Sequence, residues 1–261
     1  MFPLLLILVK GAGCQWIGIA SNGALFRGGP FRGSSGYPSR MVKHIVWDWN
    51  GTLLNDVDAV VAATNSAFRR LAFEVEEVGR DQWRASYCRP IQAFYQRLLG
   101  WAPTSEQFVE LDTVFHDEYR LLLPDCALAA DALPTLTGWQ RSGRTQSLLS
   151  MWRHHELVPY IDHSGLTTYF TRVDGLTGAA GGPKAEHLAK HLAALGLEPA
   201  EVGLVGDSHD DALAAQHVGA ACVLYSGGFH DPASLTGLGW PVAHSLSEAV
   251  ELLTTGAVHA D

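Results

Sequence analysis

Two short apolar runs in this chain each end at a carboxylate. Residues 44–47 precede Asp48 and a Gly-Thr turn, and residues 202–205 precede Gly206 and Asp207. Short apolar runs bounded by turn residues predict buried strands, and the longer periodic stretches that follow predict helices. In open parallel α/β sheets, ligands bind beyond the carboxyl ends of the strands. We therefore expect Asp48 and Asp207 to converge although they lie far apart in the sequence.

Apolar residues at helical spacing fill the segment between the first strand and the next core elements. Residues 56–70 predict a helix beside the first strand, and the pattern stays helical over 74–130. We predict a parallel α/β core over 41–56 and 131–261, with a small all-helical cap over 57–130 that includes its linking helix. The remaining core predictions are a helix at 133–141, a strand at 145–149 ending at Ser150, a helix at 185–195 and a final strand at 221–225.

The first 40 residues have a different pattern. A short apolar run at 1–9 is followed by Lys10 and then by a Gly/Ser-rich stretch. Nine apolar residues are too few to span a bilayer, and a signal peptide would carry its positive charge before the apolar run. We predict that 1–40 is an N-terminal extension outside the fold and that Met41 is the natural start.

Composition narrows the class of protein. The chain has 261 residues, 47% of them hydrophobic and 17% charged, which suits one core with a smaller second domain. A formal net charge of −9 argues against nucleic acid as a partner. The four cysteines form no CxxC pair and predict buried thiols in a reducing compartment. We expect a cytoplasmic protein with no membrane partner, and no pattern identifies its oligomeric state.

Carboxylates at strand ends favour metal-assisted phosphoryl transfer. Asp48 can attack phosphorus and form an aspartyl-phosphate, which divides hydrolysis into two displacements. Mg²⁺ prefers oxygen ligands, and the side chains of Asp48, Asp207 and Asp211 together with the backbone carbonyl of Asn50 suit it. The predicted cofactor is therefore Mg²⁺.

Other residues offer contacts to a phosphoryl group. Ser150 can donate a hydrogen bond to a phosphoryl oxygen, and Lys184 can neutralise the charge on these oxygens. The amides of the turn at Gly51 and Thr52 predict an anion-binding nest. Arg89, between two helical stretches of the cap, is a candidate for a substrate-facing residue, because its planar guanidinium binds phosphate or carboxylate.

These residues together resemble the haloacid dehalogenase superfamily. The segment 48–52, Ser150, Lys184 and the segment 206–211 resemble its four motifs in the right order, over about 43–249. The helical insertion between the first two motifs is similar to the small cap of phosphoglycolate-phosphatase-like hydrolases. The resemblance implies a Rossmann-like core and a Mg²⁺-dependent phosphatase of a small phosphorylated metabolite, with phosphoglycolate as one substrate.

Asn50 departs from this pattern. Phosphatases of the superfamily usually carry a second aspartate at this position, which protonates the leaving alcohol and later activates water. An amide can do neither, and the loss of a general acid/base costs on the order of 10²–10⁴ in rate. His209 is a candidate substitute because its ordinary pKa suits proton transfer near neutrality; a histidine on a surface loop is the alternative.

Three functions stay open from the sequence. The first is the Mg²⁺-dependent phosphatase acting through Asp48. The second is a non-catalytic or very slow phosphometabolite-binding protein, because Asn50 replaces the acid/base. The third is a haloacid dehalogenase, which uses the aspartate nucleophile without a metal. The presence of Asp207, Asp211 and Lys184 argues against the third.

Overall fold

The computed structural model describes residues 17–19, 25–27, 41–177 and 182–256. The chain divides into two units, Met1–Ser35 and Gly36–Asp261. In the first unit, β1 (Ile17–Ile19) pairs antiparallel with β2 (Leu25–Arg27). Residues 1–16, 20–24 and 28–40 of the predicted extension lie outside the described residues. The extension and the proposed start at Met41 therefore stay predictions.

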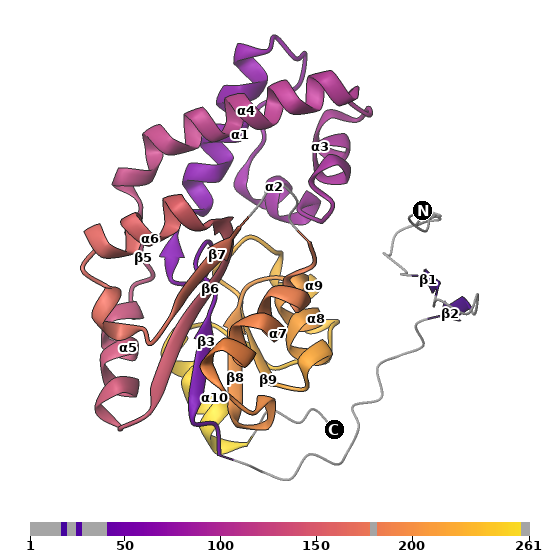
Figure 1. The fold of residues 1–261 in the computed structure, drawn as a ribbon. Coiled ribbons are helices and arrows are strands. Elements are labelled where there is room, and N and C mark those ends of the chain that lie inside the picture. Colours follow the sequence, from indigo (N-terminus) through magenta and orange to yellow (C-terminus); the bar gives the residue numbers. More distant parts are fainter. Residues whose placement is uncertain (1–16, 20–24, 28–40, 178–181, 257–261) are drawn as a thin grey trace. The chain divides into compact units, whose positions relative to one another are not determined.

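A parallel sheet forms the centre of the second unit (Figure 1). Its strand order is β10-β9-β8-β3-β6-β7, and every neighbouring pair is parallel. The strands are β3 (His44–Trp47), β6 (Thr145–Arg153), β7 (Val173–Leu176), β8 (Val202–Gly206), β9 (Ala221–Tyr225) and β10 (Val242–Ala243). Renumbered within the sheet, this is the 3-2-1-4-5-6 order of a doubly wound fold. The predicted Rossmann-like α/β class is confirmed.

Helices cover both faces of the sheet. They are α5 (Ala132–Arg141), α6 (His154–His163), α7 (Lys184–Leu195), α8 (His209–Val218), α9 (Pro232–Thr236) and α10 (Leu246–Thr255). Successive side chains of a strand point to opposite faces. Accordingly, Ile45 and Trp47 join the core cluster that contains α5 and α10, while Val46 joins the cluster that contains α7 and α8.

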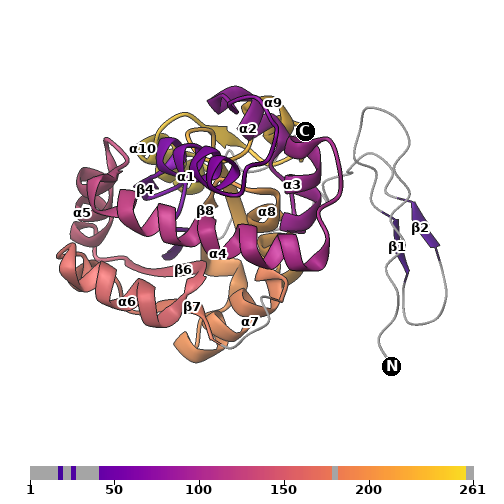
Figure 2. The ribbon, with the colours of Figure 1, turned by 90° about the horizontal axis from the view of Figure 1, so that it is seen from above.

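A group of helices lies beyond the carboxyl ends of the strands (Figures 1 and 2). They are α1 (Val57–Arg70), α2 (Arg80–Ser86), α3 (Ile91–Leu99) and α4 (Ser105–Leu122). The chain leaves the core through β4 (Leu54–Asn55) and returns through β5 (Ala127–Leu128), and these two strands pair antiparallel. Short 3₁₀ turns occupy Leu123–Asp125, Thr167–Tyr169 and Pro199–Glu201. The exact division into core and cap at 57 and 130 stays a prediction.

The structure corrects several element predictions. The strand predicted to end at Ser150 continues to Arg153, because Arg153 pairs with Leu176 of β7 after an irregularity in the register. The stretch over 74–130 includes the strand β5, and β10 follows the strand that we predicted to be the last. Of the cysteines, Cys222 is buried as predicted, whereas Cys88 and Cys126 are half-buried, and Cys14 lies outside the described residues. None of the described helices combines the length and the apolar character needed to cross a bilayer.

Candidate active site

Asp48 and Asp207 lie at the topological switch point of the sheet. β3 and β8 are adjacent in the sheet. The half of the sheet beside β3 continues with β6 and β7, and the half beside β8 continues with β9 and β10. The backbone N–H of Asp48 donates to the carbonyl of Val205, at 2.9 Å, so the two loops leave the sheet side by side. The predicted convergence of the two aspartates is observed.

Three carboxylates and one ammonium group form a buried cluster at this point. One ligand oxygen from each of Asp48, Asp207 and Asp211 lies within 4.8 Å of the others. Lys184 as a whole residue is 3% exposed. Its Nζ pairs with Asp48 Oδ1 and lies 2.5 Å from Asp211 Oδ1. One positive charge therefore faces three acidic groups in a nearly dry environment.

The electrostatics of this cluster follow from burial and charge. Burial raises the pKa of Asp48 to about 6, although Lys184 opposes the shift. Burial, together with the charges of Asp48 and Asp211, raises the pKa of Asp207 well above its ordinary value. Burial would lower the pKa of Lys184, but Asp211 and Asp48 outweigh it and raise this pKa. Lys184 is therefore charged, and the carboxylates repel one another.

Asp207 is held by groups from two other loops. Thr52 Oγ1 donates to Asp207 Oδ1 at 3.2 Å, and the backbone N–H of Phe229 donates to Asp207 Oδ2 at 2.5 Å. Gly51 has φ +75°, and a Cβ there would stand 2.6 Å from Asp207 Oδ2. At Gly228 the corresponding distance is 2.1 Å. Both loops need glycine because they pack directly on this carboxylate.

Helix starts position Lys184 and Asp211. Lys184 is the first residue of α7, where a positive charge opposes the helix dipole, so its ion pairs must supply the compensation. Asp211 is the third residue of α8 and forms a capping box with Ser208: the Ser208 side chain accepts from the N–H of Asp211, at 3.3 Å, and the Asp211 side chain accepts from the N–H of Ser208, at 3.0 Å. This box fixes the Asp211 carboxylate toward Lys184.

Asn50 contacts residues from both the core and α4. Its Nδ2 donates to Asp56 Oδ2 at 2.8 Å and to the Tyr119 hydroxyl at 2.9 Å. Its Oδ1 accepts from Ser150 Oγ at 3.4 Å. Ser150 Oγ also accepts from the N–H of Trp152 at 3.0 Å. Ser150 therefore contacts Asn50, two residues after the proposed nucleophile, and its role in binding phosphoryl oxygens stays a prediction.

The turn amides proposed to bind substrate have protein partners in the structure. The N–H of Gly51 donates to Asp56 Oδ1, at 2.8 Å, and to the carbonyl of Leu54, at 3.0 Å. The N–H of Thr52 donates to the carbonyl of Trp49 at 3.1 Å. A role of Gly51 and Thr52 in substrate binding stays a prediction, and the observed bonds assign both residues to the shape of the loop.

The loop between α2 and α3 contacts the start of α8. Arg89 Nε lies 2.9 Å from Asp210 Oδ2, so the proposed substrate-facing arginine forms an ion pair with the core. The ring of His209 stacks on that of His230 with centroids 4.4 Å apart, and burial lowers the pKa of His209. His209 Nε2 is buried and has no hydrogen-bond partner among the described residues. His209 is thus a neutral imidazole at the first position of α8, two residues from both Asp207 and Asp211.

The carboxylate cluster fits a divalent cation. The oxygens of Asp48, Asp207 and Asp211 are hard donors, and Mg²⁺ is bound in proteins by few carboxylates with water completing the shell. Lys184 compensates one of the three negative charges, and a divalent cation would compensate the others. The donor set and its charge therefore match the predicted cofactor.

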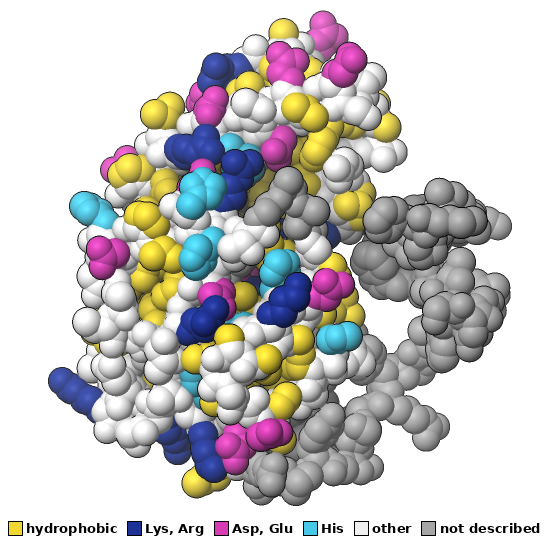
Figure 3. All heavy atoms as spheres, in the orientation of Figure 1, with side chains coloured by type: hydrophobic (Ala, Val, Ile, Leu, Met, Phe, Trp, Pro, Cys, Tyr) yellow, Lys and Arg dark blue, Asp and Glu magenta, His cyan; other side chains and the backbone are white. Residues whose placement is uncertain are grey.

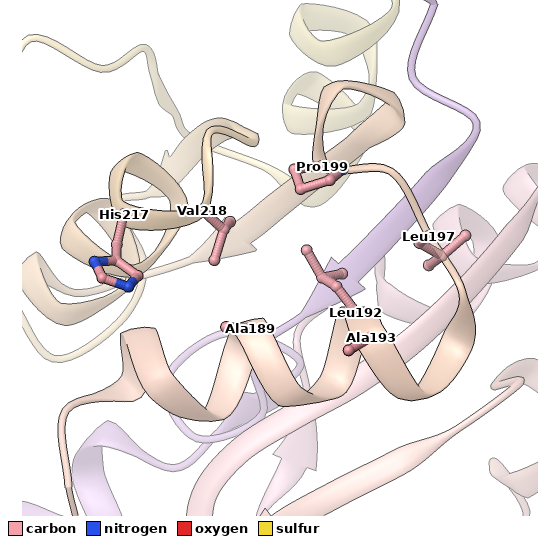
Figure 4. A pocket seen from close by; sticks show the side chains of 7 residues that line it. All are labelled: Ala189, Leu192, Ala193, Leu197, Pro199, His217 and Val218. Atoms are coloured by element: carbon pink, nitrogen blue, oxygen red, sulfur yellow. The ribbon is translucent and has the colours of Figure 1, made fainter.

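An apolar hollow on the surface of α7 and α8 does not belong to this site. It has a volume of about 320 Å³ and lies against the second halves of α7 and α8 (Figure 4). Its lining includes Leu192, Leu197 and Val218, whereas Lys184 and Asp211 stand in the first turns of the same helices. The hollow is therefore at the opposite end of these helices.

Sequence reasoning missed several residues around the site. Asp56 and Tyr119 hold Asn50, and Arg84 Nη2 donates to the carbonyls of Ser226 and His230 at 2.6 and 2.9 Å. Asp56 follows the first motif at the start of a predicted helix, and an aspartate at this position is typical of an ordinary helix cap. Tyr119 and Arg84 lie on helix faces, and no sequence signal separates them from neighbouring surface residues.

The chain is similar to proteins of one family. A family model for haloacid dehalogenase-like hydrolases matches residues 42–219. The chain is 29% identical over 196 residues to a phosphoglycolate phosphatase of Synechococcus elongatus, covering 73% of this chain and 87% of that protein. It is 25% identical to a phosphoglycolate phosphatase of Chromobacterium violaceum, covering 82% and 98%. A haloacid dehalogenase-like family hydrolase from Streptococcus pneumoniae shares the fold, with a TM-score of 0.70, 18% identity and coverage of 80% and 97%.

Proposed function

Because the chain belongs to the haloacid dehalogenase-like hydrolase family, we propose that it is a Mg²⁺-dependent phosphatase of a small phosphorylated metabolite. The observation that carries the proposal is the buried cluster of Asp48, Asp207, Asp211 and Lys184 at the switch point of the sheet. Phosphatase relatives that match most of their own length support the reaction class. Phosphoglycolate, the compound in their names, is the first substrate to test.

Asp48 is the proposed nucleophile. One of its oxygens forms a bond to phosphorus while the bond from phosphorus to the ester oxygen breaks, and the leaving oxygen takes a proton from solvent water. Water then attacks the same phosphorus, breaks the bond to Asp48 and releases inorganic phosphate. Lys184 holds Asp48 in place by an ion pair and presents its positive charge to the phosphoryl oxygens, and Ser150 offers its hydroxyl as a donor.

Asp207, Asp211, Asp48 and the backbone carbonyl of Asn50 are the proposed Mg²⁺ ligands. When bound, the ion would offset the repulsion between the Asp48 carboxylate and the substrate phosphate. Thr52, Phe229 and the capping box at Ser208 keep the carboxylates of Asp207 and Asp211 directed at this position. The protein thus supplies a preformed anionic site that suits a doubly charged cation.

Asn50 supports a second candidate, a phosphometabolite-binding protein with little or no turnover. Its amide is committed to Asp56 and Tyr119 and cannot transfer a proton. His209 is the proposed substitute acid/base. Its ring, kept neutral by burial, can accept a proton from the attacking water, and it would have to be protonated first to serve the leaving alcohol. A metal-free dehalogenase is disfavoured, since it would leave the buried acidic cluster without the charge that balances it.

Charge and cysteine burial bear on the compartment and the partners of the proposed enzyme. We propose a cytoplasmic enzyme without a nucleic-acid partner. Figure 3 shows positive and negative side chains interspersed on the face that it draws, and the formal net charge is −9. The buried thiol of Cys222, whose pKa burial raises well above its ordinary value, suits a reducing compartment.

The direct test is phosphate release from a panel of small phosphate esters, with Mg²⁺ and with a chelator. We expect release from the wild type with Mg²⁺ only, and a loss of at least a thousandfold in Asp48→Asn, because an amide is a poor nucleophile. Asp58→Asn is the matched control, since Asp58 is 79% exposed on α1. Metabolite binding without release in the wild type would support the second candidate instead.

A further inference from the structure

Asp56 departs from the usual behaviour of a residue at a helix start. It is the N-cap of α1, where an aspartate normally accepts a hydrogen bond from the first turn of its own helix. In this structure its side chain makes no such bond. It turns back instead to the loop after β3, and its Oδ1 accepts from the N–H of Gly51 at 2.8 Å. The Asp56 carboxylate therefore stabilises this loop instead of capping α1.

The other oxygen of Asp56 joins the core to α4. Asp56 Oδ2 accepts from Asn50 Nδ2 at 2.8 Å and from the Tyr119 hydroxyl at 2.6 Å. Asn50 Nδ2 also donates to the Tyr119 hydroxyl at 2.9 Å. Asp56 is fully buried and Tyr119 is 6% exposed. These three side chains form a closed triangle in which every donor has an acceptor.

The triangle determines how Asn50 presents its amide. Because Nδ2 is directed at Asp56 and Tyr119, Oδ1 is directed at Ser150 Oγ, at 3.4 Å. A carboxylate at position 50 would have no proton to donate and would face the Asp56 carboxylate across the same 2.8 Å. An amide at position 50 and a carboxylate at position 56 are therefore complementary, and neither can be exchanged alone.

We propose that Asp56 and Tyr119 are positioning residues for Asn50, which turn its side-chain oxygen toward Ser150 and tie the loop that carries Asp48 to α4. This inference rests on the proposed function, because it concerns the same site. It also changes the interpretation of Asn50: the asparagine is one half of a matched pair with Asp56. Restoring an aspartate at position 50 alone should then fail to restore an acid/base.

The test is a reciprocal exchange of the two residues. Asn50→Asp and Asp56→Asn are each expected to lower the Tm by about 5–10 °C, since each breaks buried hydrogen bonds and places like groups opposite one another. The double variant restores one amide donor and one carboxylate acceptor with the positions exchanged. We expect it to recover at least half of the summed Tm loss and to release phosphate at least tenfold faster than Asn50→Asp.

Kinetics separate positioning from general stability. Tyr119→Phe is expected to lower kcat about tenfold, with KM changed less than twofold, because the hydroxyl orients Asn50 without contacting substrate. Tyr169→Phe is its control, since the Tyr169 hydroxyl bonds Thr137 in the core, at 3.1 Å. Asp131→Asn is the control for position 56: Asp131 is also an N-cap whose side chain leaves its own helix, and it accepts from Ser247 instead. Both controls should leave kcat unchanged.

If the wild type is active, any one of three results would overturn the inference. They are additive Tm losses, no rescue in the double variant, and a gain of activity from Asn50→Asp alone. Failure of the proposed function looks different: the wild type itself would release no phosphate. In that case the Tm cycle still shows whether residues 50 and 56 are coupled, and coupling without turnover would overturn the assignment to catalysis.

Discussion

Lys184 supplies one positive charge among three buried carboxylates, and this balance links stability to the metal. Its Nζ pairs with Asp48 and lies 2.5 Å from Asp211 Oδ1, and all three side chains are buried. Removing one partner of a buried ion pair leaves the others uncompensated in a medium of low polarity. A divalent cation that binds the folded state can offset part of this cost.

Lys184→Met should therefore destabilise the protein most when Mg²⁺ is absent. We expect the free energy of unfolding to fall by about 3–5 kcal/mol in the presence of a chelator, and Mg²⁺ to stabilise the variant more than the wild type. Urea unfolding with and without Mg²⁺ measures both effects. Lys190→Met is the control, because Lys190 is exposed on the same helix. Equal unfolding free energies of Lys184→Met and wild type in chelator would contradict this charge balance.

At the residue scale, the sequence predicted which charged groups converge but not the residues that hold them in place. Asp48, Asp207, Asp211 and Lys184 meet in one cluster, because their positions at strand ends and helix starts are readable as local patterns. Tyr119 and its partner Asp56 are 63 positions apart, and their contact arises only when α4 packs against α1. Such a contact has no local signal.

Among elements, β3, β6 and α7 are joined by a buried chain of polar side chains. His44 bonds Thr145 Oγ1 and Ser147 Oγ, each at 2.7 Å, and His191 Nε2 lies 2.7 Å from the same Ser147 oxygen. His191 Nδ1 lies 2.7 Å from Asp174 Oδ2 on β7. These hydrogen-bonded side chains connect neighbouring strands of the sheet. They include His44, at the end of β3 opposite Asp48.

This chain of hydrogen bonds makes stability depend on pH. Burial, and next the charge of His191, lowers the pKa of His44 from 6.5 to about 4. The unfolded state therefore binds a proton at a higher pH than the folded state. The contribution of neutral His44 is complete above pH 6.5 and is lost as the pH falls toward 4, and a shift of this size corresponds to about 3 kcal/mol.

Denaturant unfolding at several pH values between 7 and 4 checks this prediction. The wild type should lose more stability over this range than His44→Gln, which has no titrating group at that position. His163→Gln is the control, because His163 is exposed at the end of α6. Parallel pH profiles for the wild type and His44→Gln would contradict the assignment.

The loop between α2 and α3 meets α8 through Arg89 and Asp210, whose side chains are 41% and 29% exposed. Ion pairs of this exposure are worth about 0.2–1 kcal/mol. Arg89→Gln should therefore leave the Tm nearly unchanged and raise KM about two- to fivefold, because the loop is less firmly held over the site. The effect should vanish in an Asp210→Asn background. An equal KM increase in that background would show that Arg89 acts on substrate directly, as its sequence context suggested.

The strands that the sequence did not predict share physical features that explain why they were missed. β3 and β8 were predictable because each is a run of four or five consecutive buried residues, three of them large and apolar, that ends at turn residues. β7 reads Val-Asp-Gly-Leu, is half-buried at the sheet edge and pairs through an irregular register with β6. β10 has two residues. Edge strands of this kind take their conformation from the neighbouring strand, and that information is absent from the local pattern.

For the whole molecule, the strand order explains how distant motifs form one site. The first strand of each half, β3 and β8, are neighbours in the middle of the sheet, and α1–α4 lie beyond their carboxyl ends (Figure 2). The order of motifs along the chain therefore predicted the convergence, whereas the contacts of the cap helices with the site required the structure. The cap carries Tyr119, Arg89 and Arg84, so it is the part in which substrate selection should reside.

The central claim is that Asp48 accepts a phosphoryl group, and trapping that intermediate tests it most directly. Asn50 can neither protonate a leaving alcohol nor activate water. An activated aryl phosphate has a leaving group that needs no proton, so with this substrate the second displacement should be the slower one and the phosphorylated protein should accumulate. Mass spectrometry of acid-quenched protein after mixing with the aryl phosphate and Mg²⁺ should show one added phosphoryl group on the peptide that contains Asp48, absent with chelator and absent in Asp48→Asn. A label on another residue, or phosphate release by Asp48→Asn at the wild-type rate, would contradict the account.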